Sequence, residues 1–188
     1  LDARSARATG WFVHQPTGRV VLVDGYRGLA LGTIDADARG QQISVADGTT
    51  GAYVLNDSTA VARPIDKREL RLGTPFGIAA LGVGRAVSSV GQAGLVVVNP
   101  DGEATVVPPE GEPLAFSVPS SSTTQIARDG SVWSIDGRDL VRATSTGTAR
   151  EDLGTSNVTL SMVGSEPLVV DSANRRVRLG RGSWQRLP

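Results

Sequence analysis

Apolar and polar residues alternate along most of this chain in short runs, which are separated by turns rich in glycine, aspartate and asparagine. Such runs are typical of short β-strands, and these turn residues tolerate the backbone angles that tight hairpins require. The clearest example is the segment 129–136, in which an Asp-Gly turn precedes a run containing Val, Trp and Ile. A second Asp-Gly pair, at 136–137, closes the run. The pattern predicts a buried strand between two turns.

A short apolar strand that ends in aspartate or asparagine occurs repeatedly. The copies are 20–24, 53–56, 95–99, 132–136 and 168–171. They are spaced about 37 residues apart, close to the roughly 40-residue period of propeller blades. Because these strands are apolar on both faces, we expect them to be inner strands packed between neighbouring sheets. We expect the final Asp or Asn to accept a hydrogen bond from the backbone of the following turn.

Each copy is flanked by further predicted strands. The strands before it are 11–14, 43–46, 86–90, 124–127 and 158–162. The strands after it are 29–34, 60–65, 104–107, 140–143 and 176–179. A weaker outer strand follows at 70–72, 114–117 and 183–187, whereas the first unit has no clear outer strand. Only 66–72 could form about two helical turns, and its alternation fits a strand equally well.

This order of strands is that of an antiparallel propeller blade. We therefore predict an all-β, β-propeller-like domain with about five blade units of antiparallel strands. A β-sandwich would also contain many short strands, but it would not require the same pattern at a regular interval. The ring either closes with a strand from the other terminus or is an arc of a larger ring, and we expect the arc. We expect a single domain over 1–188 that is a piece of a longer protein, with units at roughly 10–41, 42–77, 78–118, 119–154 and 155–188.

Composition excludes several functions. The chain has 19 basic and 19 acidic residues, so no net charge favours nucleic acid or an anionic membrane. It contains no cysteine, which excludes disulfides, thiolate metal sites and a cysteine nucleophile. Its apolar runs are too short to span a bilayer, so we expect no membrane insertion by this segment.

Few residues are suited to catalysis or metal binding. His14 is the only histidine, and its place at a strand end before Pro16 predicts an exposed or capping role rather than membership of a catalytic triad. The segment 35–40 begins like a calcium loop, but Arg39 stands where a third oxygen ligand is needed, so we expect a charged loop between blades. The segment 129–133 lacks the spacing of the Asp box of sialidases. We expect no metal and no cofactor.

The last unit contains an arginine-rich stretch. Its candidate binding residues are Arg175, Arg176, Arg178 and Arg181. Arginine pairs well with phosphate, so this stretch could hold a polyanion such as a wall phosphate polymer. In 176–179 the arginines alternate with apolar residues, which is also how a strand keeps one face in water, and this second interpretation is the stronger.

The chain resembles the N-terminal β-propeller region of actinobacterial envelope proteins that carry fibronectin type III or immunoglobulin-like domains further along. The resemblance rests on the repeated strand units and on the segments 129–133, 70–73, 167–171 and 178–179. It implies an extracytoplasmic, non-catalytic domain that binds a protein partner in the cell envelope, and it transfers no catalytic residue.

Two other hypotheses remain from the sequence. One is a propeller enzyme, a lyase or glycosidase, whose catalytic residues lie mostly outside this segment. The other is wall-polyanion binding through the arginine-rich strands. Independently of these, an open arc would have unpaired blade edges, which predicts self-association or dependence on neighbouring segments.

Overall fold

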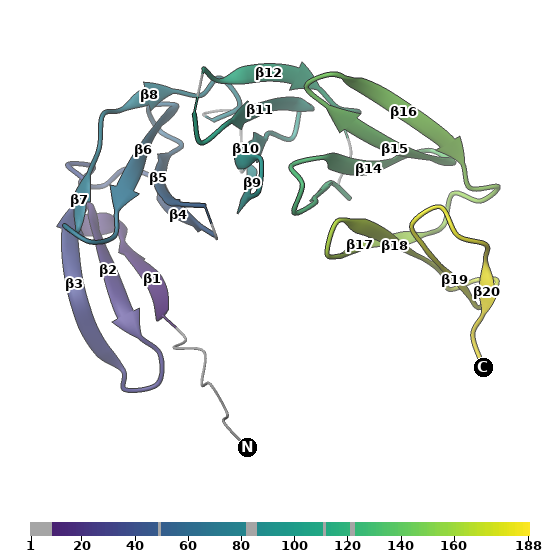
Figure 1. The fold of residues 1–188 in the computed structure, drawn as a ribbon, viewed down its shortest axis with the longest axis horizontal. Coiled ribbons are helices and arrows are strands. Elements are labelled where there is room, and N and C mark those ends of the chain that lie inside the picture. The colour runs from purple at the N-terminus through teal and green to yellow at the C-terminus, as the bar shows by residue number, and fades with distance from the viewer. Residues whose placement is uncertain (1–8, 49, 82–85, 111, 121–122) are drawn as a thin grey trace.

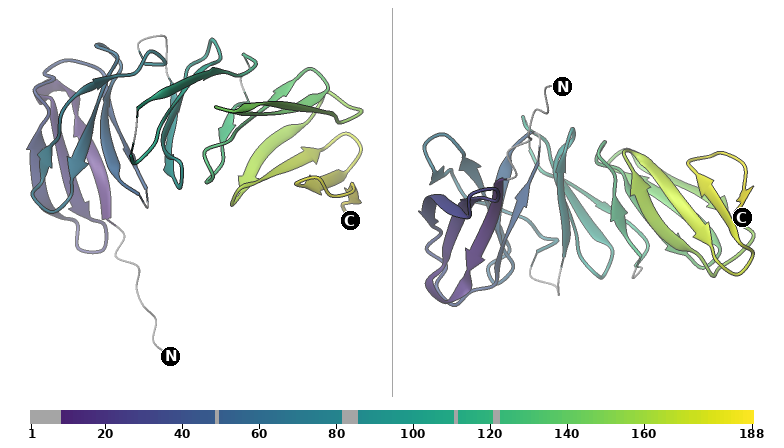
Figure 2. Two further views of the ribbon diagram at one scale, coloured as in Figure 1. Left: turned by 45° about the horizontal axis from the view of Figure 1, so that its top comes forward. Right: turned by 90° about the horizontal axis from the view of Figure 1, so that it is seen from below.

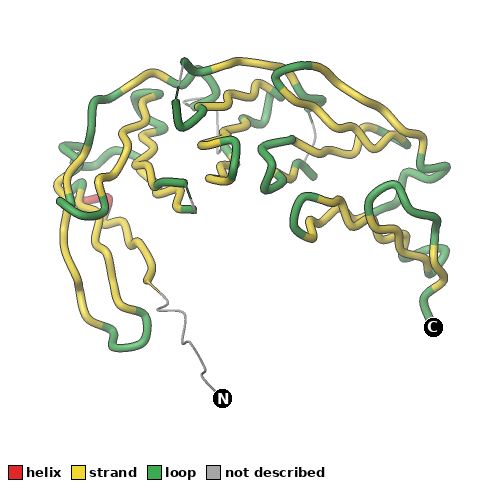
Figure 3. Tube along the Cα trace, viewed as in Figure 1, coloured by secondary structure: helices red, strands yellow, loops and turns green. Residues whose placement is uncertain are grey.

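The chain forms a series of antiparallel sheets that follow one another along an open arc (Figure 1). The computed structural model describes residues 9–48, 50–81, 86–110, 112–120 and 123–188. The Cα trace shows that these ranges consist almost entirely of strands, loops and turns (Figure 3), apart from one 3-10 helix, η1 (Gln15–Thr17). None of the described helices is long and apolar enough to cross a membrane.

There are five sheets. The first contains β1 (Thr9–His14), β2 (Arg19–Asp24) and β3 (Leu29–Asp35). The second contains β4 (Ile43–Asp47), β5 (Ala52–Asn56), β6 (Val61–Asp66) and β7 (Arg71–Leu72), with β8 (Phe76–Gly77) also paired to β6. The third contains β9 (Val87–Gly91), β10 (Gly94–Val98), β11 (Glu103–Val107) and β12 (Leu114–Ser117). The fourth contains β13 (Gln125–Ile126), β14 (Val132–Asp136), β15 (Asp139–Thr144) and β16 (Gly147–Asp152). The fifth contains β17 (Thr159–Val163), β18 (Glu166–Asp171), β19 (Arg176–Leu179) and β20 (Gln185–Arg186).

Sequence-adjacent strands pair in every sheet, so each sheet is a meander of hairpins. The predicted all-β, propeller-like architecture with about five units is therefore confirmed. The first sheet has three strands, as its sequence indicated. The helical alternative for 66–72 is wrong, because β6 ends at Asp66 and a turn leads directly into β7. Asp66 holds this turn, since its Oδ1 accepts hydrogen bonds from the backbone N–H groups of Arg68 and Glu69 at 2.9 and 3.1 Å.

The apolar strand that ends in Asp or Asn is the second strand of each sheet. In four sheets the side-chain oxygen of this residue accepts a hydrogen bond from a backbone N–H further along the chain, as predicted. These acceptors are Asp24, Asn56, Asn99 and Asp171. Asp136 differs, because its Oδ2 accepts a hydrogen bond from Nη1 of Arg150 at 2.7 Å.

The hydrophobic core is divided into four clusters, one between each pair of neighbouring sheets. Alternation along β10 shows how this arises. Leu95 and Val97 pack in the cluster with the second sheet, whereas Val96 and Val98 pack in the cluster with the fourth. All four are almost completely buried. Because successive side chains of a strand point to opposite faces, a strand between two sheets must be apolar at every position.

The hairpin turns of neighbouring sheets are also joined by hydrogen bonds. The hydroxyl of Thr50, after β4, donates to the carbonyl of Gly91 at 2.6 Å, and the N–H of Gln92 donates to the carbonyl of Arg128 at 2.9 Å. These bonds join the second sheet to the third and the third to the fourth. The first strands of successive sheets contact one another in the same order, β1 with β4, β4 with β9, β9 with β13 and β13 with β17.

The first and fifth sheets form the two ends of the arc, so each has a neighbouring sheet on one face (Figure 2). Their other faces point out of the arc. The arrangement places sheets face to face throughout, and the interfaces between them hold both the core and the polar sites described below.

Candidate functional site

The four arginines of the predicted binding stretch do not form one surface. Arg178 is only 5% exposed, and its Nη1 donates to Oε1 of Glu151 in the fourth sheet at 2.8 Å. The expectation that these arginines form the water-exposed face of the strand is therefore wrong for Arg178. It is Leu179, the next residue, that is exposed. The register explains this, because Arg178 pairs with the buried Val169 and shares its face.

Arg176 is half-buried and lies on the same face of β19 as Arg178. Its Nε donates to Oδ2 of the fully buried Asp171 at 2.9 Å. Hydrogen bonds from the side chains of Asn174 and Arg176 lower the pKa of Asp171 below its usual value. The guanidinium groups of Arg176 and Arg178 lie 4.3 and 5.7 Å from the ring centroid of Trp184, in the range of cation–π contacts. The sequence did not indicate this role for Trp184.

The other two arginines have separate positions. Arg175 lies in the turn before β19 with a positive φ of 49°, and its Nη2 donates to the carbonyl of Pro188. Arg181 follows β19, is exposed, and makes no ion pair within the part of the chain that the structure describes. The structure thus brings Arg176 and Arg178 together around Trp184 and places Arg175 and Arg181 elsewhere.

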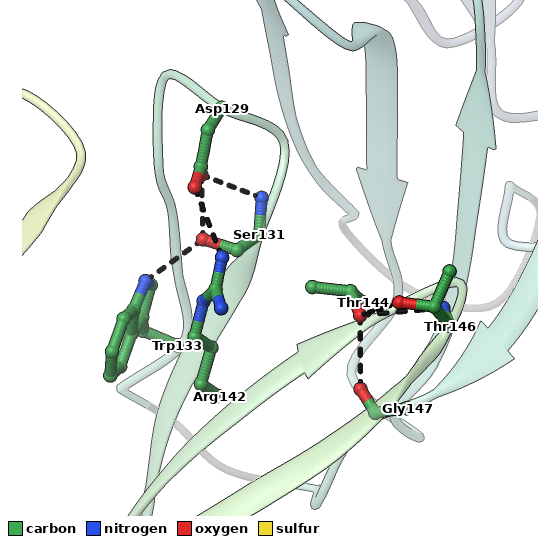
Figure 4. A network of polar contacts seen from close by, with 7 residues as sticks. All are labelled: Asp129, Ser131, Trp133, Arg142, Thr144, Thr146 and Gly147. Atoms are coloured by element: carbon green, nitrogen blue, oxygen red, sulfur yellow. Dashed lines mark hydrogen bonds and ion pairs between the residues drawn. The ribbon is translucent and has the colours of Figure 1, made fainter.

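Asp129 is the centre of a polar network at the start of β14 (Figure 4). Its Oδ1 accepts hydrogen bonds from the backbone N–H and the hydroxyl of Ser131 at 3.0 and 2.6 Å. The same hydroxyl accepts a bond from Nε1 of Trp133 at 3.0 Å. Nη2 of Arg142 lies 3.2 Å from Oδ2 of Asp129, and its guanidinium lies 5.8 Å from the Trp133 ring centroid. The Asp-Gly turn therefore fixes both an indole and a guanidinium.

This network changes the acidity of Asp129. Burial acts to raise the pKa of the carboxyl group, but the hydrogen bonds from Ser131 and the nearby charge of Arg142 outweigh it, so the pKa is lowered. A carboxyl group with a lower pKa in the folded state stabilises the protein at pH values above the pKa of the unfolded chain, about 3.9. That stabilisation is lost as the pH falls through the pKa of the folded state.

We expect Asp129→Asn to reduce the free energy of unfolding by about 1 kcal/mol at pH 7, because the ion pair with Arg142 is lost. The variant should lose less stability than the wild type when the pH is lowered from 7 to 3. Urea unfolding at pH 7, 5 and 3 measures both effects. Asp152→Asn is the control, since Asp152 forms an exposed ion pair with Arg138 on the same sheet. Parallel pH curves for wild type and Asp129→Asn would contradict the role assigned to Asp129.

A pocket of about 300 Å³ opens beside this network. It is lined by Trp133, Leu140, Arg142, Ala149, Arg150, Glu151 and Arg181. Three of these side chains are cationic and one is anionic. Arg150 is held in place by Asp136 and Asp139, whose carboxylates lie 2.7 and 3.5 Å from its Nη1 and raise its pKa. Arg181 is the one residue of the predicted arginine stretch that lines this pocket.

The other candidates from the sequence, His14 and the segment 35–40, both lie in the first unit and take part in local hydrogen bonds. Nδ1 of the exposed His14 lies 2.7 Å from the hydroxyl of Thr17. The segment 35–40 joins β3 to β4, which is the predicted loop between blades, and Oδ1 of Asp35 accepts a bond from the N–H of Asp37. In the described ranges, no group of three or more His, Cys, Asp or Glu residues is placed to hold a metal ion.

Exposed apolar side chains are concentrated on the first and last sheets. Seven of the nine large apolar residues that are exposed in the described ranges belong to these ends. They are Phe12, Tyr26, Leu29 and Leu31 at one end and Val163, Leu179 and Leu187 at the other. The two exposed residues of the inner sheets are Val87 and Leu114.

No protein-family model matches the chain, and no curated protein matches it. Solved structures do resemble it. Virginiamycin B lyase from Staphylococcus aureus, solved with quinupristin, superposes with a TM-score of 0.63 at 12% identity, covering 97% of this chain and 67% of the lyase. Dihydro-heme d1 dehydrogenase NirN superposes with a TM-score of 0.61 at 12% identity, covering 97% of this chain and 44% of the dehydrogenase. The Cps50 (Swd1) β-propeller domain of Myceliophteria thermophila superposes with a TM-score of 0.55 at 13% identity, covering 94% of this chain and 65% of that domain. These similarities show a β-propeller fold, and this chain spans 44% to 67% of the three proteins.

Proposed function

We propose that this chain is a non-catalytic β-propeller scaffold that binds another protein through the outward faces of its first and fifth sheets. The observation that carries the proposal is the concentration of exposed apolar side chains at these two ends. Large exposed apolar patches on a folded protein commonly mark sites of interaction with another protein. Following the sequence resemblance, we place the domain outside the cytoplasm, in the cell envelope.

The alternation of side chains shows which face of the first sheet is free. In β1, Trp11 and Val13 pack against the cluster shared with the second sheet. Phe12 lies between them in the strand, so its side chain points to the opposite face, and it is 62% exposed. Val21, the partner of Phe12 in β2, is half-buried on the same face. The free face of the first sheet therefore carries an apolar patch around Phe12 and Val21, next to the polar pair His14 and Arg19.

The same reasoning applies to the fifth sheet. In β19, Arg178 points to the fourth sheet, so Leu179 points away from it. In β17, Leu160 and Met162 pack in the cluster with the fourth sheet, and Val163 points away. We call the outward surfaces that contain Phe12 at one end and Val163 with Leu179 at the other the terminal faces. Burying such faces against a partner would release water from apolar surface and stabilise the complex.

Paired substitutions test the proposal. The tagged chain captures proteins from envelope extract, and the captured protein is identified, purified and titrated against variants. We expect Val163→Ser with Leu179→Ser to weaken binding by about tenfold or more, because two apolar contacts are lost. Phe12→Ser tests the other terminal face in the same assay.

A matched control is available in the inner sheets. Val87 and Leu114 are 47% and 51% exposed, close to the 53% and 45% of Val163 and Leu179. Val87→Ser with Leu114→Ser should leave binding unchanged. Equal weakening by both pairs, or by neither the pair nor Phe12→Ser, would refute binding at the terminal faces. Sedimentation of each variant separates a partner protein from a second copy of this chain as the bound molecule.

A further inference from the structure

The pocket between the fourth and fifth sheets has the features of a small binding site that is separate from the terminal faces. We propose that it binds an oxyanion, a phosphate or carboxylate group attached to a small carbon skeleton of roughly the size of a sugar. The proposal is independent of protein binding at the terminal faces, because none of the lining residues belongs to those faces.

Strand register brings five lining residues of the fourth sheet onto one face, whereas Arg150 belongs to the opposite face. Arg150 pairs with Val141, and its Nη1 is held there by Asp136 and Asp139. Trp133 pairs with Arg142, and Arg142 pairs with Ala149 across three adjacent strands. Leu140 and Glu151 form the neighbouring pair. Trp133 and Leu140 pack in the cluster shared with the fifth sheet, so this face is the one that points to that sheet. The pocket is therefore built on rigid strands, which hold side chains more precisely than a loop does.

Arg142 is the arginine of this face, and it is oriented by an aspartate while retaining unused donors. Its ion pair with Asp129 uses Nη2. A guanidinium group has five N–H donors, so Arg142 keeps further donors for a bound oxyanion. Because the side chain is already oriented before binding, less conformational entropy is lost when the ligand binds. Arg181 adds a second cation and has no ion-pair partner within the described ranges.

Glu151 does not neutralise this charge, because it is already paired with Arg178. The Arg178 side chain is buried, and its Nε and Nη2 have no hydrogen-bond partner in the part of the chain that the structure describes. Buried donors are normally satisfied, and an unsatisfied pair on one guanidinium is unusual. The poorly solvated positive charge of Arg178 therefore balances the negative charge of Glu151. The positive charges of the other arginines that line the pocket remain available to attract an anion.

The size and the apolar residues of the pocket define the rest of the ligand. A volume of about 300 Å³ is at the lower end of the range for small-molecule sites. Leu140, Ala149 and Trp133 supply the apolar part of the lining. A sugar phosphate or a uronic acid combines an oxyanion with a carbon skeleton of suitable size. The shared chemistry is the oxyanion, and separate probes distinguish the two sources.

Tryptophan side chains provide the measurement. The indole N–H signals of the ¹⁵N-labelled chain are recorded during titration with glucose 6-phosphate, glucuronate, inorganic phosphate and glucose. We expect glucose 6-phosphate or glucuronate to shift the signal of Trp133, which lines the pocket. The signal of Trp11 should stay in place, because its Nε1 donates to Asp47 at the other end of the arc. Glucose should have no effect, and inorganic phosphate alone should bind more weakly than a ligand that also fills the apolar part.

Substitutions locate the effect. Arg142→Ser with Arg181→Ser should weaken binding by about tenfold or more, since charge-assisted hydrogen bonds are lost. Arg138→Ser with Arg27→Ser is the matched control, because Arg138 forms an exposed ion pair on the same sheet and Arg27 is exposed on the first. A shift with only one of the two anionic sugars supports the proposal and identifies the oxyanion. An absence of any Trp133 shift at millimolar probe, or equal weakening by the control pair, overturns it.

Discussion

Replacing Gly91 with alanine should destabilise the protein by about 3 kcal/mol, a large effect for the addition of one methyl group. Gly91 ends β9 and is buried against the turn of the next sheet. A Cβ atom at this position would lie 2.3 Å from the carbonyl oxygen of Arg128. Because the obstacle is backbone, the two sheets would have to move apart. The hydrogen bond from Gln92 to the same carbonyl and the one from Thr50 to Gly91 would be strained with them.

Thermal and urea unfolding measure this effect, and a second glycine controls for it. Gly77 ends β8, and a Cβ atom there would have no heavy atom within 4 Å. Gly77→Ala should therefore change the free energy of unfolding by less than about 0.5 kcal/mol. If both variants are equally stable, the third and fourth sheets do not approach as closely as described.

Glu151→Ala should also destabilise the protein by about 3 kcal/mol, because it leaves the buried guanidinium of Arg178 without its ion-pair partner. The destabilisation comes from the buried charge of Arg178, which loses its partner, and not from the removal of the glutamate itself. Glu151 is partly exposed, whereas Arg178 is buried. Substituting Arg178 by methionine removes the buried charge and retains most of the volume. Arg178→Met alone should therefore stay within about 1 kcal/mol of the wild type.

The double variant is the decisive measurement for this pair. Glu151→Ala combined with Arg178→Met should regain most of the stability that Glu151→Ala loses, because no unpaired buried charge remains. Urea unfolding of the wild type, both single variants and the double variant gives the coupling energy. Additive losses in the double variant would mean that Glu151 and Arg178 stabilise the fold independently.

The strand order could be predicted because its signals are local. Apolar alternation and turn residues act within a few positions, and their repetition at a regular interval indicates sheets of the same kind. The outer strand β16 was missed for the same reason. Its sequence, Gly147 to Asp152, is polar and almost fully exposed, so it has no apolar period. Pairing with β15 makes it a strand, and the turn residues Thr144 to Gly147 were its only local signal.

The site could be predicted much less well. Alternation in β19 indicates that Arg176 and Arg178 share a face, but it does not indicate which face points to the neighbouring sheet. Charged residues normally occupy the water-exposed face, so the inward orientation of Arg178 requires a partner in another sheet. That partner, Glu151, lies in the strand that was missed. The pocket therefore depends on register between two sheets, which no short stretch of sequence contains.

The bonds and clusters that join each sheet to the next make the molecule a one-dimensional array of nearest neighbours. A terminal sheet is held by a single interface, so it can open without disturbing the others. The third sheet is held by two interfaces, and opening it would divide the array into independent pairs. Protection from hydrogen exchange is therefore expected to be greatest at β10 and to decline toward both ends, which leaves the terminal faces in the most adaptable parts of the molecule.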